Sequence, residues 1–184
     1  ELIERCYTHN ERLRRLLNDV SLITRMEDGS ALIGKERVVI NDIIDEVAKE
    51  LNMLSDDERL KLHTNFDTEV IIDGNPSLIG SIFRNLTENS IAYSEGDNIY
   101  ISLLENNDKW CRIRFEDDGK GVEQKHISRL FERFYRVDKG RSRQKGGTGL
   151  GLAIVKHAVM FHGGTITATN RPNGGLRFDF TLCK

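Results

Sequence analysis

Hydrophobic positions in residues 1–28 recur every seven residues, which is typical of a helix that packs against another helix. Cys6, Leu13 and Val20 form one such row, and neighbouring rows are interleaved with it. A single helix cannot bury this stripe by itself. We therefore expect it to pair with a helix outside this chain or with a second copy. The alternative is that it packs back onto its own domain. Asp28-Gly29-Ser30 is predicted to end the helix.

Helical periodicity returns four times in the rest of the chain. Asn41 and Asn75 are predicted to cap two of these helices through their side chains, and Pro76 stands at a favoured first helical position. The predicted helices cover residues 41–54, 76–93, 124–130 and 148–161.

Alternating polar and apolar residues predict strands between these helices. The predicted strands are Leu60–Phe66, Val70–Ile72, Ile99–Leu104, Cys111–Phe115, Thr165–Thr169 and Gly175–Leu182. Turn residues at 106–108 and 171–174 join the last four into two hairpins. We therefore predict an α/β fold, a two-layer sandwich of a mixed, mostly antiparallel sheet and about three helices, preceded by one long helix.

Composition limits the classes of function. The chain has 184 residues, of which 38% are hydrophobic and 30% charged, and this suits one domain with a short appendage. The net charge of -2 gives no reason to expect nucleic acid as a partner. No apolar run approaches the ~18 residues that cross a bilayer. We expect a cytoplasmic part of a longer protein that makes no membrane contact of its own.

Two polar motifs suggest a nucleotide site. Asn85, Asn89 and Ala92 share a helical face distinct from the apolar one, and carboxamide oxygens can bind Mg²⁺ without adding negative charge beside a triphosphate. Taken alone, a pair of asparagines is more often a solvated face. Residues 117–121, Asp-Asp-Gly-Lys-Gly, follow a predicted strand. A carboxylate there could accept a hydrogen bond from the adenine amine, although Asp-Gly turns are also common.

Two further motifs surround a basic, glycine-rich loop. Residues 131–138 interleave aromatic and arginine side chains, so that Phe131 and Phe134 would anchor the loop and leave Arg133 or Arg136 to meet phosphate. Residues 146–152, Gly-Gly-Thr-Gly-Leu-Gly-Leu, open a predicted helix. Exposed backbone N–H groups at a helix start bind anions such as phosphates.

These four motifs, in this order, resemble the four boxes of the ATP-binding domain of sensor histidine kinases. That domain belongs to the superfamily shared with DNA gyrase, heat-shock chaperone and mismatch-repair ATPases. The resemblance implies a catalytic domain at residues 31–184 with an ATP lid at 132–147. It also implies that residues 1–30 form the second helix of the dimerisation stalk.

The resemblance implies roles for individual residues. Asn89 corresponds to the magnesium ligand and Asp117 to the adenine-binding aspartate, while Asn85 and Arg136 are the expected catalytic residues. The expected nucleotide contacts are Asn85, Asn89, Tyr93, Asp117, Gly119, Gly121, Tyr135, Arg136, Gly147, Thr148, Gly149, Leu150 and Gly151.

The chain departs from the family pattern at three points. Ala92 stands where a lysine or arginine often helps to hold phosphate, and Ser90 stands where alanine is usual. None of the five histidines has the acidic residue and the nearby proline that follow the family's phosphoacceptor. The resemblance therefore implies that the phosphorylated histidine lies on a first stalk helix absent from this chain.

We therefore expect a protein-histidine kinase domain that uses ATP and Mg²⁺. Its expected partners are the missing stalk helix, a second kinase protomer and the receiver domain of a response regulator. Two alternatives stay open: an ATPase of the same superfamily, although Asn85 replaces its usual glutamate base, and a module that keeps the fold only to bind partners. Whether the intact protein is anchored at the inner membrane also stays open.

Overall fold

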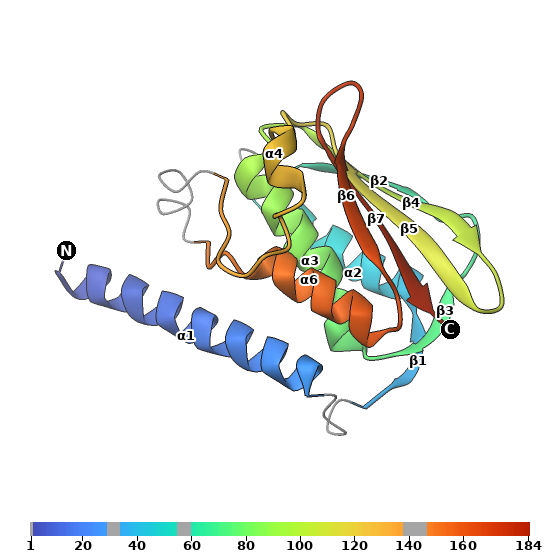
Figure 1. The fold of residues 1–184 in the computed structure, drawn as a ribbon, viewed down its shortest axis with the longest axis horizontal. Helices are drawn as coiled ribbons and strands as arrows, with labels where there is room; N and C mark the ends of the chain where they lie inside the picture. The colour runs from blue at the N-terminus through green and yellow to red at the C-terminus, as the bar shows by residue number, and fades with distance from the viewer. Residues whose placement is uncertain (1, 29–33, 55–59, 138–146) are drawn as a thin grey trace.

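A computed structural model describes residues 2–28, 34–54, 60–137 and 147–184. Its main sheet has five strands in the order β2-β4-β5-β7-β6. They are β2 (Lys61–Asn65), β4 (Asn98–Asn106), β5 (Trp110–Asp117), β6 (Ile166–Asn170) and β7 (Leu176–Cys183). Only the pairing of β2 with β4 is parallel. The prediction of a mixed, mostly antiparallel sheet is confirmed, with helices gathered on one face (Figure 1).

A second, two-stranded sheet was not predicted. It pairs β1 (Glu36–Val39) with β3 (Ile71–Gly74) in antiparallel register. Strand β1 could not be predicted from the sequence, because the strand has only four residues and its first two are exposed and charged. Its partner is also more than thirty residues away along the chain, so no local turn marks the pairing.

The helix α2 (Ile40–Asn52) begins differently from the prediction. Its N-cap residue is Val39, which makes no side-chain capping bond, so the prediction that Asn41 caps the helix is wrong. The Asn41 carboxamide instead accepts a hydrogen bond from the Val70 N–H at 2.9 Å and donates to the Thr68 carbonyl at 3.3 Å. Asn41 therefore joins α2 to the strand segment before β3 and fixes the edge of the domain.

The centre of the helical layer consists of α3 (Pro76–Tyr93) and α6 (Gly151–Phe161), with the short α4 (Gln124–Ile127) at one end. The predicted cap of α3 is confirmed, since the Asn75 Oδ1 accepts from the Leu78 N–H at 3.0 Å. Both helices bury apolar side chains against phenylalanines of the sheet, and Phe83 meets Phe180 edge-on. The predicted start of the last helix at Thr148 is three residues early, because Leu150 is the N-cap residue.

The long helix α1 (Leu2–Glu27) packs back onto its own domain with its C-terminal half, which was the alternative expectation. Ile23 and Met26 are buried on that face, and α1 lies against α6 (Figure 1). A second row of apolar side chains stays at the surface, consisting of Tyr7, Leu13, Leu17 and Val20. The helix thus has one apolar face in use and another exposed. The predicted Gly29-Ser30 stop lies outside the described residues.

A buried histidine joins the two central helices. The His162 Nε2 accepts a hydrogen bond from the Asn75 N–H at 3.0 Å, and its Nδ1–H donates to the Ala158 carbonyl at 2.7 Å. His162 is 2% exposed. Burial lowers the pKa of this imidazole below its ordinary value of 6.5, and the neutral ring accepts the N–H of the residue that caps α3. The end of α6 is thereby fixed to the start of α3.

This histidine predicts how stability depends on pH. As the pH falls below about 6.5, the unfolded chain takes up a proton at residue 162 before the folded chain does, so the free energy of unfolding should decrease. Substituting His162→Gln, which keeps an acceptor and removes the titration, should flatten this part of the curve in urea unfolding between pH 5 and 8. The control His63→Gln, at an exposed position, should keep the wild-type slope. An unchanged slope in His162→Gln would contradict the assignment.

Candidate nucleotide-binding site

A single buried carboxylate ends strand β5. Asp117 is 3% exposed, and its Oδ1 accepts hydrogen bonds from the Gly119 N–H at 3.0 Å and from the Leu176 N–H at 3.2 Å. Burial raises the pKa of this carboxyl group above its ordinary value, although the two backbone donors oppose the shift. Because Oδ1 is occupied, Oδ2 is the oxygen left to face a ligand.

Ser90 contributes to the same position from α3. Its buried hydroxyl donates to the Asp117 Oδ2 across 3.4 Å, a long hydrogen bond. This hydrogen bond also opposes the rise in the carboxyl pKa. Ser90, which stands where the family usually has alanine, therefore contacts the oxygen that would accept a hydrogen bond from the adenine amine.

The wall behind Asp117 comes from the last hairpin of the chain, which the sequence analysis did not assign to the site. Arg171 donates from Nη1 to the Asp117 carbonyl at 2.9 Å, and Leu176 supplies the backbone donor already described. Gly175 has a φ of +100°, and a Cβ at this position would overlap the Asp117 carbonyl oxygen. Its signal in the sequence was the pair Gly174-Gly175, of which Gly174 was interpreted as the end of a turn and Gly175 as the start of a strand.

The first glycine box follows directly after Asp117. A Cβ on Gly119 would overlap the Ser94 carbonyl at the end of α3, so the chain passes very close to that helix. The Lys120 N–H donates to the same carbonyl at 2.8 Å. Gly121 has a φ of +68°, a conformation that glycine adopts without strain. These contacts place the first glycine box against the C-terminal end of α3.

The second glycine box lies along one face of the same helix. A Cβ on Gly151 would come within 2.9 Å of the Asn85 Oδ1, and a Cβ on Gly147 would come within 2.6 Å of the Tyr93 hydroxyl. Asn89 is one helical turn from each of these α3 residues and shares their face. Within the described part of the chain, the Asn89 carboxamide makes no hydrogen bond. The asparagine face predicted from the sequence therefore faces the predicted phosphate-binding turn.

The two segments that flank the lid bond to each other. The Arg136 guanidinium donates to the Gly147 carbonyl, and the Phe134 N–H donates to the Gly149 carbonyl at 2.9 Å. Gly149 has a φ of +76°, so a side chain there would strain the backbone. Arg136 is thus brought to the glycine box. Residues 138–146, which include most of the predicted lid and Gly146, lie outside the described residues.

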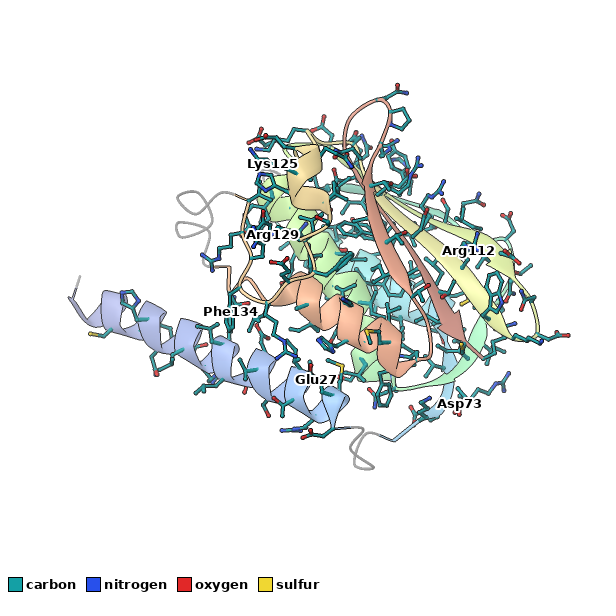
Figure 2. The ribbon with its side chains drawn as sticks, in the orientation of Figure 1. Glu27, Asp73, Arg112, Lys125, Arg129 and Phe134 are labelled. Carbon is teal, nitrogen blue, oxygen red and sulfur yellow. The ribbon has the colours of Figure 1, made fainter. Side chains whose placement is uncertain are left out.

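The predicted anchoring of the lid is half correct. Phe131 packs on Phe178 of the sheet, with ring centroids 6.2 Å apart. Phe134 does not anchor on the core: it is 59% exposed and has a φ of +62° (Figure 2). Arg133 is also engaged, in an ion pair with Glu27 of α1.

Tyr135 is held by α4 and by Arg129, two residues beyond the end of that helix. Its hydroxyl is 2.5 Å from the His126 Nδ1, and the Arg129 guanidinium lies over its ring, 4.2 Å from the centroid. Arg129 is fixed in turn by hydrogen bonds from its Nε and Nη2 to the Glu132 carboxylate. The structure thus brings Tyr135 to the root of the lid, where it contacts His126 and Arg129.

A separate groove lies on the other side of α3. It has a volume of about 390 Å³ and is lined by parts of β1, α2 and the first turns of α3, including Arg37 and Arg84. It shares no residue with the two glycine boxes. Arg84, which lines this groove, is tied to Glu50 by a bidentate ion pair.

The donor set suits a nucleotide with a hard cation. One end offers a carboxylate oxygen and closely approaching backbone, which fit an adenine amine and its ring. The other end offers the start of α6, where backbone N–H groups favour phosphate, with a carboxamide oxygen for Mg²⁺. From Asn85 to Ser94 the helix rises roughly 13 Å, enough to join a base to a triphosphate.

Comparison with known proteins agrees with this geometry. Residues 74–184 match the family described as histidine kinase-, DNA gyrase B- and HSP90-like ATPases. This chain belongs to that family. The curated relatives that it matches are sensor histidine kinases, and the chain carries their catalytic ATPase domain. It is 34% identical over 181 residues to the sensor protein kinase WalK of Staphylococcus aureus. The match covers 94% of this chain and 42% of that protein.

Solved histidine kinases share the fold. The ATP-binding domain of PrrB from Mycobacterium tuberculosis matches with a TM-score of 0.65 and 26% identity, over 81% of this chain and 96% of that one. The Acinetobacter baumannii histidine kinase AdeS matches with a TM-score of 0.78 and 22% identity, over 99% of this chain and 83% of that one. The chain spans less than half the length of the curated relatives that it matches.

Proposed function

We propose that this histidine kinase-type domain binds Mg-ATP and transfers the γ-phosphate to a histidine on a stalk helix outside these 184 residues. The observation that carries the proposal is the buried Asp117 at the end of β5, beside the C-terminal part of α3, the helix that also carries the asparagine face opposite the glycine box. The product is phosphohistidine, whose phosphoryl group then passes to an aspartate of a response regulator receiver domain.

The proposed roles follow the two ends of α3. Asp117 accepts the adenine amine, and Asn89 ligates Mg²⁺ while the backbone of the second glycine box holds the phosphates. Asn85 and Arg136 flank the transferred group. Catalysis of phosphoryl transfer depends mainly on placement and charge neutralisation, which these side chains provide. The remaining proposed nucleotide contacts are Tyr93, Gly119, Gly121, Tyr135, Gly147, Thr148, Gly149, Leu150 and Gly151.

The stalk and partners belong to the proposal as well. We assign residues 1–30 to the second stalk helix and residues 31–184 to the catalytic domain. The exposed row Tyr7, Leu13, Leu17 and Val20 would meet other stalk helices in a four-helix bundle of two protomers. No helix that the structure describes is long and apolar enough to cross a membrane. We place the reaction in the cytoplasm.

Mixing this chain with a separate polypeptide that carries the missing histidine-bearing helix and labelled Mg-ATP tests the transfer. Acid-labile label should appear on the added helix and not on this chain. Steady release of inorganic phosphate without labelled helix would instead favour an ATPase, even though Asn85 cannot take a proton as the glutamate of those enzymes does. Absence of any heat on calorimetric titration with Mg-ATP would favour the module that binds only partners.

The metal assignment gives a separate prediction. Mg²⁺ is expected to raise the ATP affinity of the wild-type chain. In Asn89→Ala this gain should be about tenfold smaller, because one oxygen ligand of the metal is lost. Calorimetry with and without Mg²⁺ measures that gain. Asn52→Ala, at the exposed end of α2, serves as the matched control and should leave it intact. Equal loss of ATP affinity with and without Mg²⁺ in Asn89→Ala would show that Asn89 contacts the nucleotide directly and not the metal.

A further inference from the structure

Helix α1 reaches the second glycine box through one carboxylate. The Thr148 hydroxyl, between Gly147 and Gly149, donates to the Asp19 Oδ2 at 3.0 Å. Asp19 is half-buried, and burial raises the pKa of its carboxyl group above the ordinary value. The side chain of a helix that precedes the catalytic domain therefore stands at the turn assigned to phosphate.

Contacts near the C-terminal end of α1 fix the helix in this place. Glu27 pairs with Arg133, and the His157 Nε2 of α6 lies 3.7 Å from the same carboxylate (Figure 2). Ile23 and Met26, between Asp19 and Glu27 along the helix, are buried. The position of Asp19 is thus determined by several contacts of α1 and not by a single side chain.

We propose that Asp19 is a specificity-determining residue that makes the docked α1 discriminate against nucleotides by their phosphate charge. This inference rests on the proposed function. A carboxylate at Thr148 repels a triphosphate more strongly than a diphosphate, and it leaves adenosine unaffected. Docking of α1 and binding of ATP therefore oppose each other. An upstream signal that moves α1 away from Thr148 raises the affinity for ATP without changing the adenine-binding end of the site.

Calorimetric titration of the 184-residue chain with adenosine, Mg-ADP and Mg-ATP tests this proposal. In Asp19→Asn, which removes the charge and keeps an acceptor for Thr148, the affinity for ATP should rise by roughly tenfold, that for ADP by less, and that for adenosine not at all. The gain should shrink as salt is raised, because exposed charges are screened. Glu11→Gln makes the same charge change on the same helix and should alter none of the three affinities.

The outcomes separate the two proposals. Wild-type chain that binds neither adenosine nor ATP would defeat the proposed function itself. If the wild-type chain binds ATP and the Asp19→Asn variant shows no higher ATP affinity, only the role of Asp19 would be defeated. An equal gain for adenosine and ATP would also overturn that role, because it would show that Asp19 acts on the shape of the site and not on the phosphate charge.

Discussion

Replacing Asp117 with asparagine is expected to weaken ATP binding by about 10- to 100-fold, the usual loss when a hydrogen bond to a charged group is removed. The amide can keep its Oδ1 on the Gly119 and Leu176 N–H groups, so the fold should survive. It would then present an NH₂ group to the adenine amine, and two donors repel each other. Calorimetry with Mg-ATP at neutral pH measures the loss.

The neighbouring carboxylate provides the control. Asp118 accepts from the Asp97 and Asn98 N–H groups at 2.9 and 2.8 Å and from the Asn98 amide at 2.6 Å, so both its oxygens are used to hold the start of β4. Asp118→Asn should therefore lower the free energy of unfolding and leave ATP affinity within a factor of about two. If Asp118→Asn and Asp117→Asn weakened ATP equally, the assignment of the adenine-binding carboxylate would be wrong.

The second large effect is expected at Gly175. Alanine there must adopt a φ of +100° and place its Cβ against the Asp117 carbonyl oxygen, so that backbone strain and overpacking add. The expected loss in the free energy of unfolding is about 2–5 kcal/mol. Urea unfolding followed by circular dichroism measures it. Because the clash is with Asp117 itself, the folded fraction should also bind ATP less tightly.

Gly34 is the matched control for this substitution. It is exposed, and a Cβ built on it meets nothing within 4 Å. Gly34→Ala should therefore change the free energy of unfolding by less than about 1 kcal/mol. A Gly175→Ala variant as stable as Gly34→Ala would mean that the last hairpin can move away from strand β5 without cost.

The elements that the sequence predicted best are those whose apolar positions repeat regularly. The capped helix α3 and the hairpin of β4 and β5 lie where their patterns placed them. Strand β1 was missed because its pairing is long-range and its first residues are charged. Asn41 was misassigned, since a carboxamide near a helix start looks the same in sequence whether it caps the helix or bonds to a distant strand.

The site shows the same division. Asp117, Asn85 and Gly149 could be named because their motifs are local. Arg171 and Leu176 could not, because only tertiary structure brings the Arg171 guanidinium and the Leu176 N–H to Asp117. The role of Asp19 was hidden for a related reason: nothing in a heptad pattern tells which polar residue of a helix meets a turn more than a hundred residues later.

The hairpin that backs Asp117 has a consequence for the growing polypeptide. Chains emerge from the ribosome N-terminus first, so Asp117 and Gly119 are synthesised well before Leu176, whose N–H is the second backbone donor to the carboxylate. Until strand β7 is synthesised, the Asp117 carboxylate therefore lacks one of its two backbone donors. A chain that stops before Leu176 should bind ATP less tightly than a chain that includes this strand.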